Sequence, residues 1–516
     1  MFLTLLRREL LANLMTFRFF VAMLVCLLLV VANSMVLIGD YERRLADYNT
    51  AVQIHRNAAV SPKVYSRLNV RVDRPPNPLS IFNGGMDKQL GNTVEIHYDF
   101  VPCLLDMELH GSDNPFLNLL ASVDLVFIFQ VVLSLLALLF AYDALAGERE
   151  SGTLRLMLTN PISRSLVLLT KYVAAMTCLI VPFLISLVLA QLLITASGAI
   201  DLSGDDWLHI GGIVLTSIIY LSAFYLMGLL ISTLSRRTAT ALMLSMFLWA
   251  ILVLIYPSVS IWTVGEFWRP EEKLKAAYGE IEQIWKEPEK ERNDYLQNHP
   301  VLRRGVWVIP LQTDYGWRVN SHSGHGRNDR MTLARHWTDR AEFIGIPETS
   351  PAQLVSDVKA YHQRLVPLWI RAAEKTWLVR QKALSEIYFR KAAIERSVMR
   401  FSPAGIYYLA TAALTGTELH EMQNFMAQAQ QYRQTIVAYL HDKKAFSSLQ
   451  WFARSDDGKK AHEGGKVDWS DLPQFSYHRA DMRTSLKHAL PELALLLLIN
   501  VLLFMGSFLI FARQEV

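Results

Sequence analysis

Few residues in this sequence have the types and spacing that catalysis requires. No glycine-rich phosphate-binding loop of the pattern GxxxxGKS or GxxxxGKT occurs, and no HExxH metal-binding pair is present. The stretch Ser321–Gly326 has two histidines but no third metal ligand nearby, so we interpret it as a polar loop. Glu418, His420 and Glu421 are expected to share one helix surface. We therefore expect no catalytic residue, no bound metal and no bound cofactor in this chain.

A more informative stretch is Glu148–Lys171, where charged side chains and leucines alternate between two apolar runs. Gly152 interrupts the helical pattern, and Asn160-Pro161 breaks it again because the residue before a proline avoids the α region. Ser163 is then in position to cap the next helix. The pattern predicts a short amphipathic helix with a break at each end. Such a helix suits docking to another protein, or an ordinary position on lipid headgroups.

The elements that hold this stretch are membrane helices. The 516 residues are 52% hydrophobic and only 19% charged, with a mean hydropathy of +0.21. A soluble protein of this length has far more charge, so the chain is an integral membrane protein. The net charge of +4 is small for this length and indicates no nucleic-acid partner. Cys26 and Cys178 lie in apolar runs, which leaves Cys103 without an exposed disulfide partner.

Six apolar runs have the length of about 18 to 25 residues that a membrane-spanning helix needs. Helices are the expected form because a helix pairs all its backbone polar groups internally. The first run could instead be a signal peptide, but it is long for one and no cleavage site follows it. The predicted spans are Phe19–Ile38, Leu117–Ala141, Tyr172–Thr195, Leu208–Thr233, Ala239–Tyr256 and Ala489–Phe511.

The short segments between the spans predict the orientation, because cytoplasmic loops are enriched in Lys and Arg. Basic residues precede span one, follow span six, and lie between spans two and three and between spans four and five. Both termini are therefore expected in the cytoplasm. The predicted divisions are 1–38 (an interfacial helix and span one), 39–116 (extracytoplasmic), 117–256 (spans two to five), 257–488 (extracytoplasmic) and 489–516 (span six and tail).

The larger extracytoplasmic segment has the features of a folded helical domain. Apolar residues from Leu354 to Ala372 recur at a spacing of three and four, which places them on one helical face, and Pro367 is expected to kink or split that helix. Ser402-Pro403 predicts the start of another helix. Residues 60–100 are rich in proline and glycine and are expected to be extended and turn-rich. The fold class is therefore an all-α polytopic membrane protein with a mostly helical extracytoplasmic domain.

Three polar residues, Asp124, Glu492 and Asn500, fall in or near the predicted spans. A polar side chain facing lipid is unfavourable, so each should face a protein interior or water. They are candidates for lining a translocation path. The alternative is that they form hydrogen bonds between helices, and Glu492 could also lie at headgroup level.

The charged stretch between spans two and three resembles the corresponding segment of ABC-2 type ABC transporter permeases. That resemblance implies that the stretch is the coupling helix, at about 148–164, which contacts a separate ATPase subunit. The amino-terminal Leu6–Leu10 also resembles the interfacial helix of the family. The residues that match the coupling pattern are Glu148, Gly152, Thr153, Leu154, Asn160, Pro161, Ile162, Arg164 and Lys171.

A looser resemblance covers the segment before the last span, where Phe401-Ser402-Pro403, Thr415-Gly416-Thr417, Phe425 and Tyr432-Arg433 are similar to a permease subgroup with a large extracytoplasmic insertion. Together the resemblances imply the membrane subunit of an ABC exporter in a bacterial inner membrane. Its expected partners are ABC ATPase subunits, which would bind ATP and Mg, a second permease copy or related permease, membrane lipids and a periplasmic protein. The alternative is a membrane-anchored scaffold or sensor whose extracytoplasmic domain binds a partner without translocation.

Overall fold

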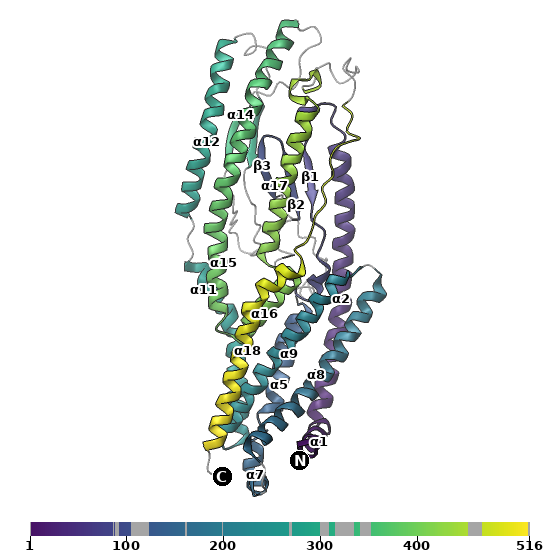
Figure 1. Cartoon of the computed structure of the whole chain (residues 1–516), viewed down its shortest axis with the longest axis vertical. Helices are drawn as coiled ribbons and strands as arrows, with labels where there is room; N and C mark the ends of the chain where they lie inside the picture. Colours follow the sequence, from purple (N-terminus) through teal and green to yellow (C-terminus); the bar gives the residue numbers. More distant parts are fainter. Residues whose placement is uncertain are drawn as a thin grey trace.

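The computed structural model describes residues 2–85, 87, 92–104, 123–159, 163–198, 200–267, 271–299, 309–314, 335–340, 352–451 and 467–513. The molecule is elongated (Figure 1). A helical bundle forms one half, and a second region, which we call the distal domain, extends from one end of it. Both chain termini and the short helix α7 (Thr153–Leu158) lie at the opposite end of the bundle, which we call the α7 end.

Six helices in the described part of the chain are long and apolar enough to cross a membrane, in agreement with the six predicted spans. Two of them are built from consecutive segments that include a π-helical turn. The single helices are α2 (Phe17–Ala59), α8 (Arg164–Ser197), α9 (Gly204–Leu234) and α18 (Met482–Arg513). The first composite helix consists of α4 (Leu125–Ile128), η3 (Phe129–Leu133), α5 (Ser134–Ala141) and α6 (Ala146–Glu150). The second consists of α10 (Thr238–Trp249), η4 (Ala250–Ile255) and α11 (Tyr256–Phe267).

The first span is part of a much longer helix than the apolar run predicts. α2 has 43 residues and continues past Ile38 into the distal domain, because charged residues end the apolar run without ending the helix. Asp40 and Arg44, one turn apart, form an ion pair of 3.2 Å that supports this continuation. The second span, predicted from Leu117, has its first described helical residue at Leu125, and residues 105–122 lie outside the described part.

The distal domain combines helices with small antiparallel sheets. The residues predicted to be extended and turn-rich contain strands β1 (Val70–Asp73) and β2 (Thr93–His97), which pair with each other. Strand β2 also pairs with β3 (Phe100–Leu104). A second sheet pairs β4 (Ile309–Asp314) with β5 (Arg335–Arg340). The helices and short helical turns here are α12 (Glu271–Asn298), α14 (Ala352–Leu384), α17 (Leu419–Asp442), η1 (Tyr65–Arg67), η5 (Ser385–Phe389), η6 (Ala445–Ser447) and η7 (Leu449–Trp451). The turn η2 (Pro78–Ile81) packs in the core of the bundle instead.

The predicted apolar face of α14 is buried in the distal core, where Tyr361 and Leu365 have no exposed surface. The helix runs without interruption through Pro367, so the expected split does not occur. Beyond the proline the helix packs along α12, where Trp285 Nε1 of α12 donates to Thr376 Oγ1 at 3.0 Å. The helix therefore acts as one continuous element.

Two further helices, α15 (Arg390–Met399) and α16 (Pro403–Thr415), form a hairpin that returns to the bundle. α16 begins at Pro403 as predicted, with Ser402 as its N-cap. Almost every residue of α16 is buried, and its Tyr407 stacks on Tyr220 with ring centroids 4.3 Å apart, near the middle of the 31-residue helix α9. Part of the segment predicted as extracytoplasmic thus packs among the spans.

Candidate coupling site at the α7 end

The predicted coupling stretch forms a knob of two short helices, α6 and α7, at the free end of the bundle (Figure 1). Between them Gly152 adopts φ +73°, a left-handed conformation that side chains disfavour. Because no atom lies within 4 Å of a Cβ built on Gly152, the glycine is required here by the backbone turn and not by crowding. Ser151 and Thr153 hydroxyls, 2.9 Å apart, brace the same turn.

The two described leucines of α7 have different environments. Leu154 is 1% exposed and packs in the bundle core, whereas Leu156 is 71% exposed at the tip. The predicted amphipathic helix is therefore anchored by one apolar side chain and presents another to its surroundings. An exposed apolar side chain on a short amphipathic helix can occupy a hydrophobic groove of a partner protein.

Glu148 lies in a buried charge cluster at the base of the knob. Lys171 Nζ of α8 is 2.7 Å from Glu148 Oε1 and 3.2 Å from both carboxylate oxygens of Glu9, which belongs to α1 (Phe2–Leu14). The three side chains are between 6% and 19% exposed. This cluster ties α1, α6 and α8 together. Glu9 and Lys171 lie in the stretches that carry the resemblance, but their contact is not evident from the sequence.

The neighbouring residues Arg149 and Glu150 hold the turn between α9 and α10, a role that the sequence did not indicate. Arg149 Nη1 donates to the carbonyl oxygens of Thr233 (3.2 Å) and Ser235 (2.8 Å), where α9 ends. Glu150 Oε2 accepts from Thr238 N (2.9 Å) and Thr238 Oγ1 (2.8 Å), where α10 begins. The knob thereby contacts two further spans.

Arg164 lies at the start of α8, where the sequence predicts a new helix. Ser163 occupies the N-cap position, although its side chain makes no capping hydrogen bond. Arg164 Nη1 donates to the carbonyl oxygens of Phe511 (2.7 Å) and Ala512 (3.0 Å) at the end of α18, where helix carbonyls lack partners within the helix. Three other residues of the coupling pattern, Asn160, Pro161 and Ile162, are outside the described residues.

The three polar candidates for the translocation path make hydrogen bonds between elements. Asp124 is the N-cap of α4, accepting from Phe127 N at 2.7 Å and from Gly84 N at 3.0 Å. Asn500 Oδ1 accepts from Ser222 Oγ at 2.5 Å. Glu492 is completely buried and is held by arginines of the α15–α16 hairpin. These contacts match the alternative of helix–helix bonding; that the residues also line a path stays a prediction.

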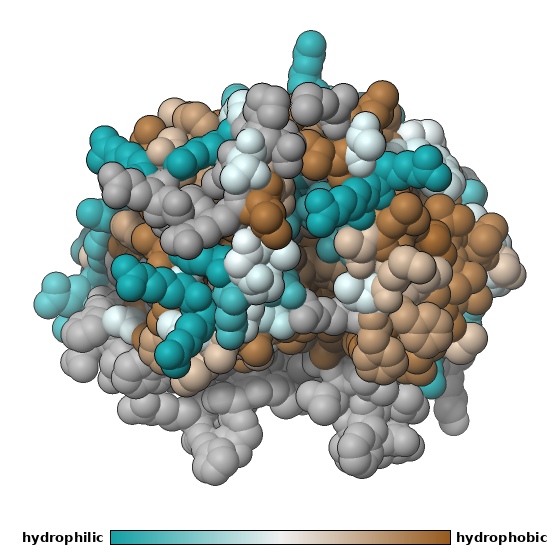
Figure 2. Space-filling view, turned by 90° about the horizontal axis from the view of Figure 1, so that it is seen from below, coloured by the Kyte–Doolittle hydropathy of each residue, from teal (hydrophilic) through white to brown (hydrophobic). Residues whose placement is uncertain are grey.

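Seen from the α7 end, hydrophilic side chains gather across the end of the molecule and hydrophobic ones cover one flank (Figure 2). This distribution is typical of a surface that leaves the membrane and contacts water or another protein. Within the described ranges, no group of three or more His, Cys, Asp or Glu side chains is arranged to hold a metal ion. The stretch Ser321–Gly326 is outside those ranges.

The looser resemblance falls on residues that organise the distal domain. Gly416 ends α16 in a left-handed conformation (φ +65°), and the backbone of Thr417 lies against Gly85. Arg433 is completely buried, where its guanidinium donates to the carbonyl oxygens of His97 (3.2 Å) and Tyr98 (2.7 Å). These positions serve packing, and the subgroup with a large insertion stays a prediction.

Comparison with known proteins agrees with this geometry. The chain matches the "Probable ABC transporter permease protein NosY" of Stutzerimonas stutzeri, with 55% identity over 42 residues, and that of Pseudomonas aeruginosa, with 54% identity over 41 residues. Each match covers 8% of this chain and 15% of the relative. The family described as ABC-2 family transporter protein matches residues 4–267, slightly more than half of the chain. The chain therefore belongs to the ABC-2 family of transporter proteins.

Proposed function

We propose that this chain is the permease subunit of an ABC exporter in a bacterial inner membrane. A separate ATPase subunit would bind ATP and Mg and contact the α6–α7 knob. The observation that carries this proposal is the attachment of the knob: hydrogen bonds and ion pairs link it to α1, α8, α9 and α10. A displacement of α7 would therefore reach four elements at once.

The proposed orientation has both termini and the knob in the cytoplasm. The basic residues at this end support it, because cytoplasmic loops are enriched in Lys and Arg. In that orientation the distal domain is extracytoplasmic, where it could receive cargo from a periplasmic partner. A second permease copy, or a related permease, would complete the path in the surrounding lipid.

The stiffness of the knob supports a mechanical role. A short helix transmits a force from the ATPase subunit only if its base is held rigidly. Leu154, Glu148 and Glu150 attach the base of the knob to the bundle. Closure of the ATPase subunits on ATP would then tilt the attached spans and open a path. A membrane-anchored scaffold would have no need of such an attachment.

The experiment is retention of the ATPase subunit on the tagged permease in detergent. Leu156→Arg places a charge at the exposed tip of α7 without disturbing the core, because this side chain is 71% exposed. We expect retention of the ATPase to fall about tenfold or more, the effect of losing an anchor residue. The matched control is Leu378→Arg in the distal domain, where the leucine is 66% exposed. Failure of the unsubstituted permease to retain any ATPase would favour the scaffold, and equal retention by both variants would contradict docking of the ATPase at Leu156.

A further inference from the structure

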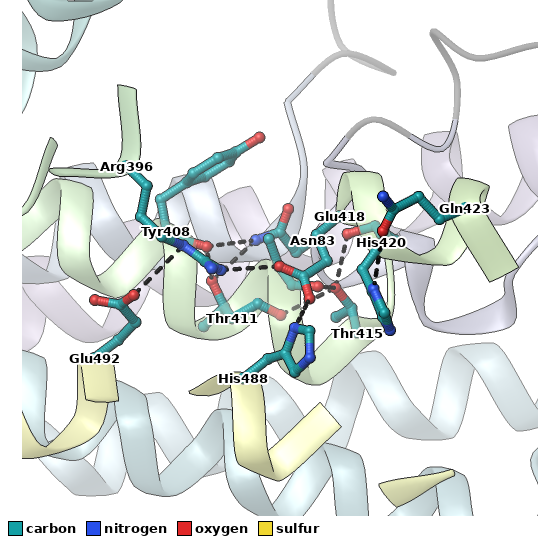
Figure 3. A network of polar contacts seen from close by, with 12 residues as sticks. Asn83, Arg396, Tyr408, Thr411, Thr415, Glu418, His420, Gln423, His488 and Glu492 are labelled. Carbon is teal, nitrogen blue, oxygen red and sulfur yellow. Dashed lines mark hydrogen bonds and ion pairs between the residues drawn. The ribbon is translucent and has the colours of Figure 1, made fainter. Parts of the chain in front are cut away.

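A second polar cluster lies at the distal end of the bundle, outside the candidate coupling site (Figure 3). It joins the α15–α16 hairpin, the start of α17 and the first half of α18. Its members are Arg396, Arg400, Glu418, His488 and Glu492, which we call the latch. No residue of the latch belongs to the coupling pattern.

The latch is a continuous chain of charges. Arg400 makes a two-point contact with the carboxylate of Glu492, at 2.9 and 2.7 Å. Arg396 lies between the two acids, 3.5 Å from Glu492 and 2.9 Å from Glu418. Glu418 also contacts His488 Nδ1 at 2.8 Å. Two arginines and two glutamates therefore balance in formal charge.

The burial of Glu492 explains why its carboxylate needs the two arginines. Glu492 is fully buried in a helix that crosses the membrane, whereas the side chains of Arg396 and Arg400 are 30% and 36% exposed. An ionised carboxylate there requires a nearby cation, because neither lipid nor the apolar core solvates it. Glu492 therefore holds α18 to the hairpin for as long as its arginines remain in place.

The opposite end of the same helix is attached to the coupling site. Arg164, at the start of α8, binds the last carbonyl groups of α18. Glu492 and Phe511 are 19 residues apart, which corresponds to about 29 Å along a helix. Between them α18 packs along α9, and Asn500 adds hydrogen bonds midway: it donates to the Ile219 carbonyl at 3.0 Å and accepts from Ser222 Oγ.

We propose that α18 is a rod that connects the coupling site to the latch, and that the latch must part for the path to open at the distal end. This inference rests on the proposed function. A displacement of the knob reaches α18 through Arg164, shifts α18 along α9, and moves Glu492 away from Arg400. α18 is suited to this because it is a single continuous helix from Met482 to Arg513.

The test measures separation at the latch directly. Ala413 of α16 and Ser485 of α18 line one small pocket together with Glu418 and His488. Cysteines at these two positions, in a chain whose native cysteines are replaced by serine, are bridged with a short thiol-reactive crosslinker in the permease–ATPase complex. Trapping the ATPase with ATP and vanadate should lower the crosslinking rate about fivefold or more, the lower end of couplings measured between distant sites.

Two variants distinguish a rod from a local structural contact. Glu492→Gln should show the low crosslinking rate without nucleotide. Its control is Glu395→Gln, whose carboxylate pairs, among the residues that the structure describes, with Lys391 of the same helix at 3.7 Å. Arg164→Gln should abolish the response to trapping, although it lies at the other end of α18. Its control is Arg236→Gln, an exposed arginine at the α7 end. If Arg164→Gln destabilises the complex, Arg164→Lys, which keeps the charge but has a shorter reach, should weaken the response.

The parent for all variants is the chain that has only the two introduced cysteines. The proposal is overturned if trapping leaves the crosslinking rate of this parent unchanged while its complex hydrolyses ATP and transports substrate. It is equally overturned if the Arg164 variants respond as the parent does. Failure of the proposed function has a different signature, because then no ATPase subunit is retained and no nucleotide effect can be measured on any variant.

Discussion

At the scale of single residues, Lys171 is the position where the base of the α6–α7 knob depends most on one charge. Its ammonium is 6% exposed and lies between the carboxylates of Glu9 and Glu148, which come from different helices. Removing one partner of a buried ion pair leaves the other charge without compensation, which is more destabilising than loss of the contact alone. Two acids share this one cation.

Lys171→Met should therefore destabilise the permease by about 3 kcal/mol, the lower end for a broken buried pair because both carboxylates keep some contact with solvent. The measurement is thermal unfolding of the purified permease in detergent. The matched control is Lys443→Met, which removes a lysine whose ion pair with Asp471 lies at the surface of the distal domain. A melting temperature of Lys171→Met equal to that of this control would contradict the role of Lys171.

At the scale of elements, the bundle depends on one close approach between spans. A Cβ built on Gly228 of α9 would lie 2.7 Å from Ala141 Cβ and 2.9 Å from Leu138 Cδ2 of α5. Small residues at such a crossing allow two membrane helices to pack closely. This contact positions α5, and with it the α6–α7 knob that follows, against α9.

Gly228→Ala should force the two helices apart and destabilise the bundle by about 1–3 kcal/mol, as overpacking does. Gly211→Ala is the matched control on the same helix, because a Cβ there meets nothing within 4 Å. Its effect should be neutral or stabilising, since alanine favours a helix more than glycine does. Thermal unfolding of both variants in detergent checks this, and equal melting temperatures would show that the helices yield without loss of stability.

At the scale of the whole molecule, the distal domain has a hydrophobic core of its own, separate from the core of the bundle. His362 of α14 lies in this distal core, 6.1 Å from the ring of Trp451 between ring centroids. Burial lowers the pKa of His362 to about 3. The imidazole is therefore neutral in the folded domain at any physiological pH.

This burial predicts an acid-sensitive distal domain. The pKa of a buried neutral histidine is lower in the folded state than the value of about 6.5 in the unfolded state. Such a histidine gives its full contribution to the free energy of unfolding above the unfolded-state pKa, and this contribution is lost as pH falls below that value. The free energy of unfolding of the distal domain should therefore fall by up to about 1.4 kcal/mol per pH unit between roughly pH 6 and 4. Denaturant unfolding followed by tryptophan fluorescence measures it, and His362→Phe should flatten the profile. An unchanged slope in that variant would assign the acid sensitivity to other groups.

Several features of this molecule could be predicted from local sequence. The six spans follow from apolar run length, because only a helix of sufficient length satisfies its backbone in lipid. The start of α16 at Pro403 and the turn at Gly152 follow from the backbone preferences of proline and glycine. The continuation of α2 beyond Ile38 was missed because hydropathy detects the membrane, and the helix continues in a solvated environment.

The sequence by itself therefore determined the fold class, the number of spans and the place of the α6–α7 knob, since each depends on residues near one another in the chain. Only the tertiary structure decided which charges meet. Lys171 contacts Glu9 across 162 positions, and Arg164 contacts the Phe511 carbonyl across 347. Such contacts depend on how whole helices pack, and many pairings of acids and bases are compatible with the same local sequence. Helix packing selects the pairs that connect the knob to α18.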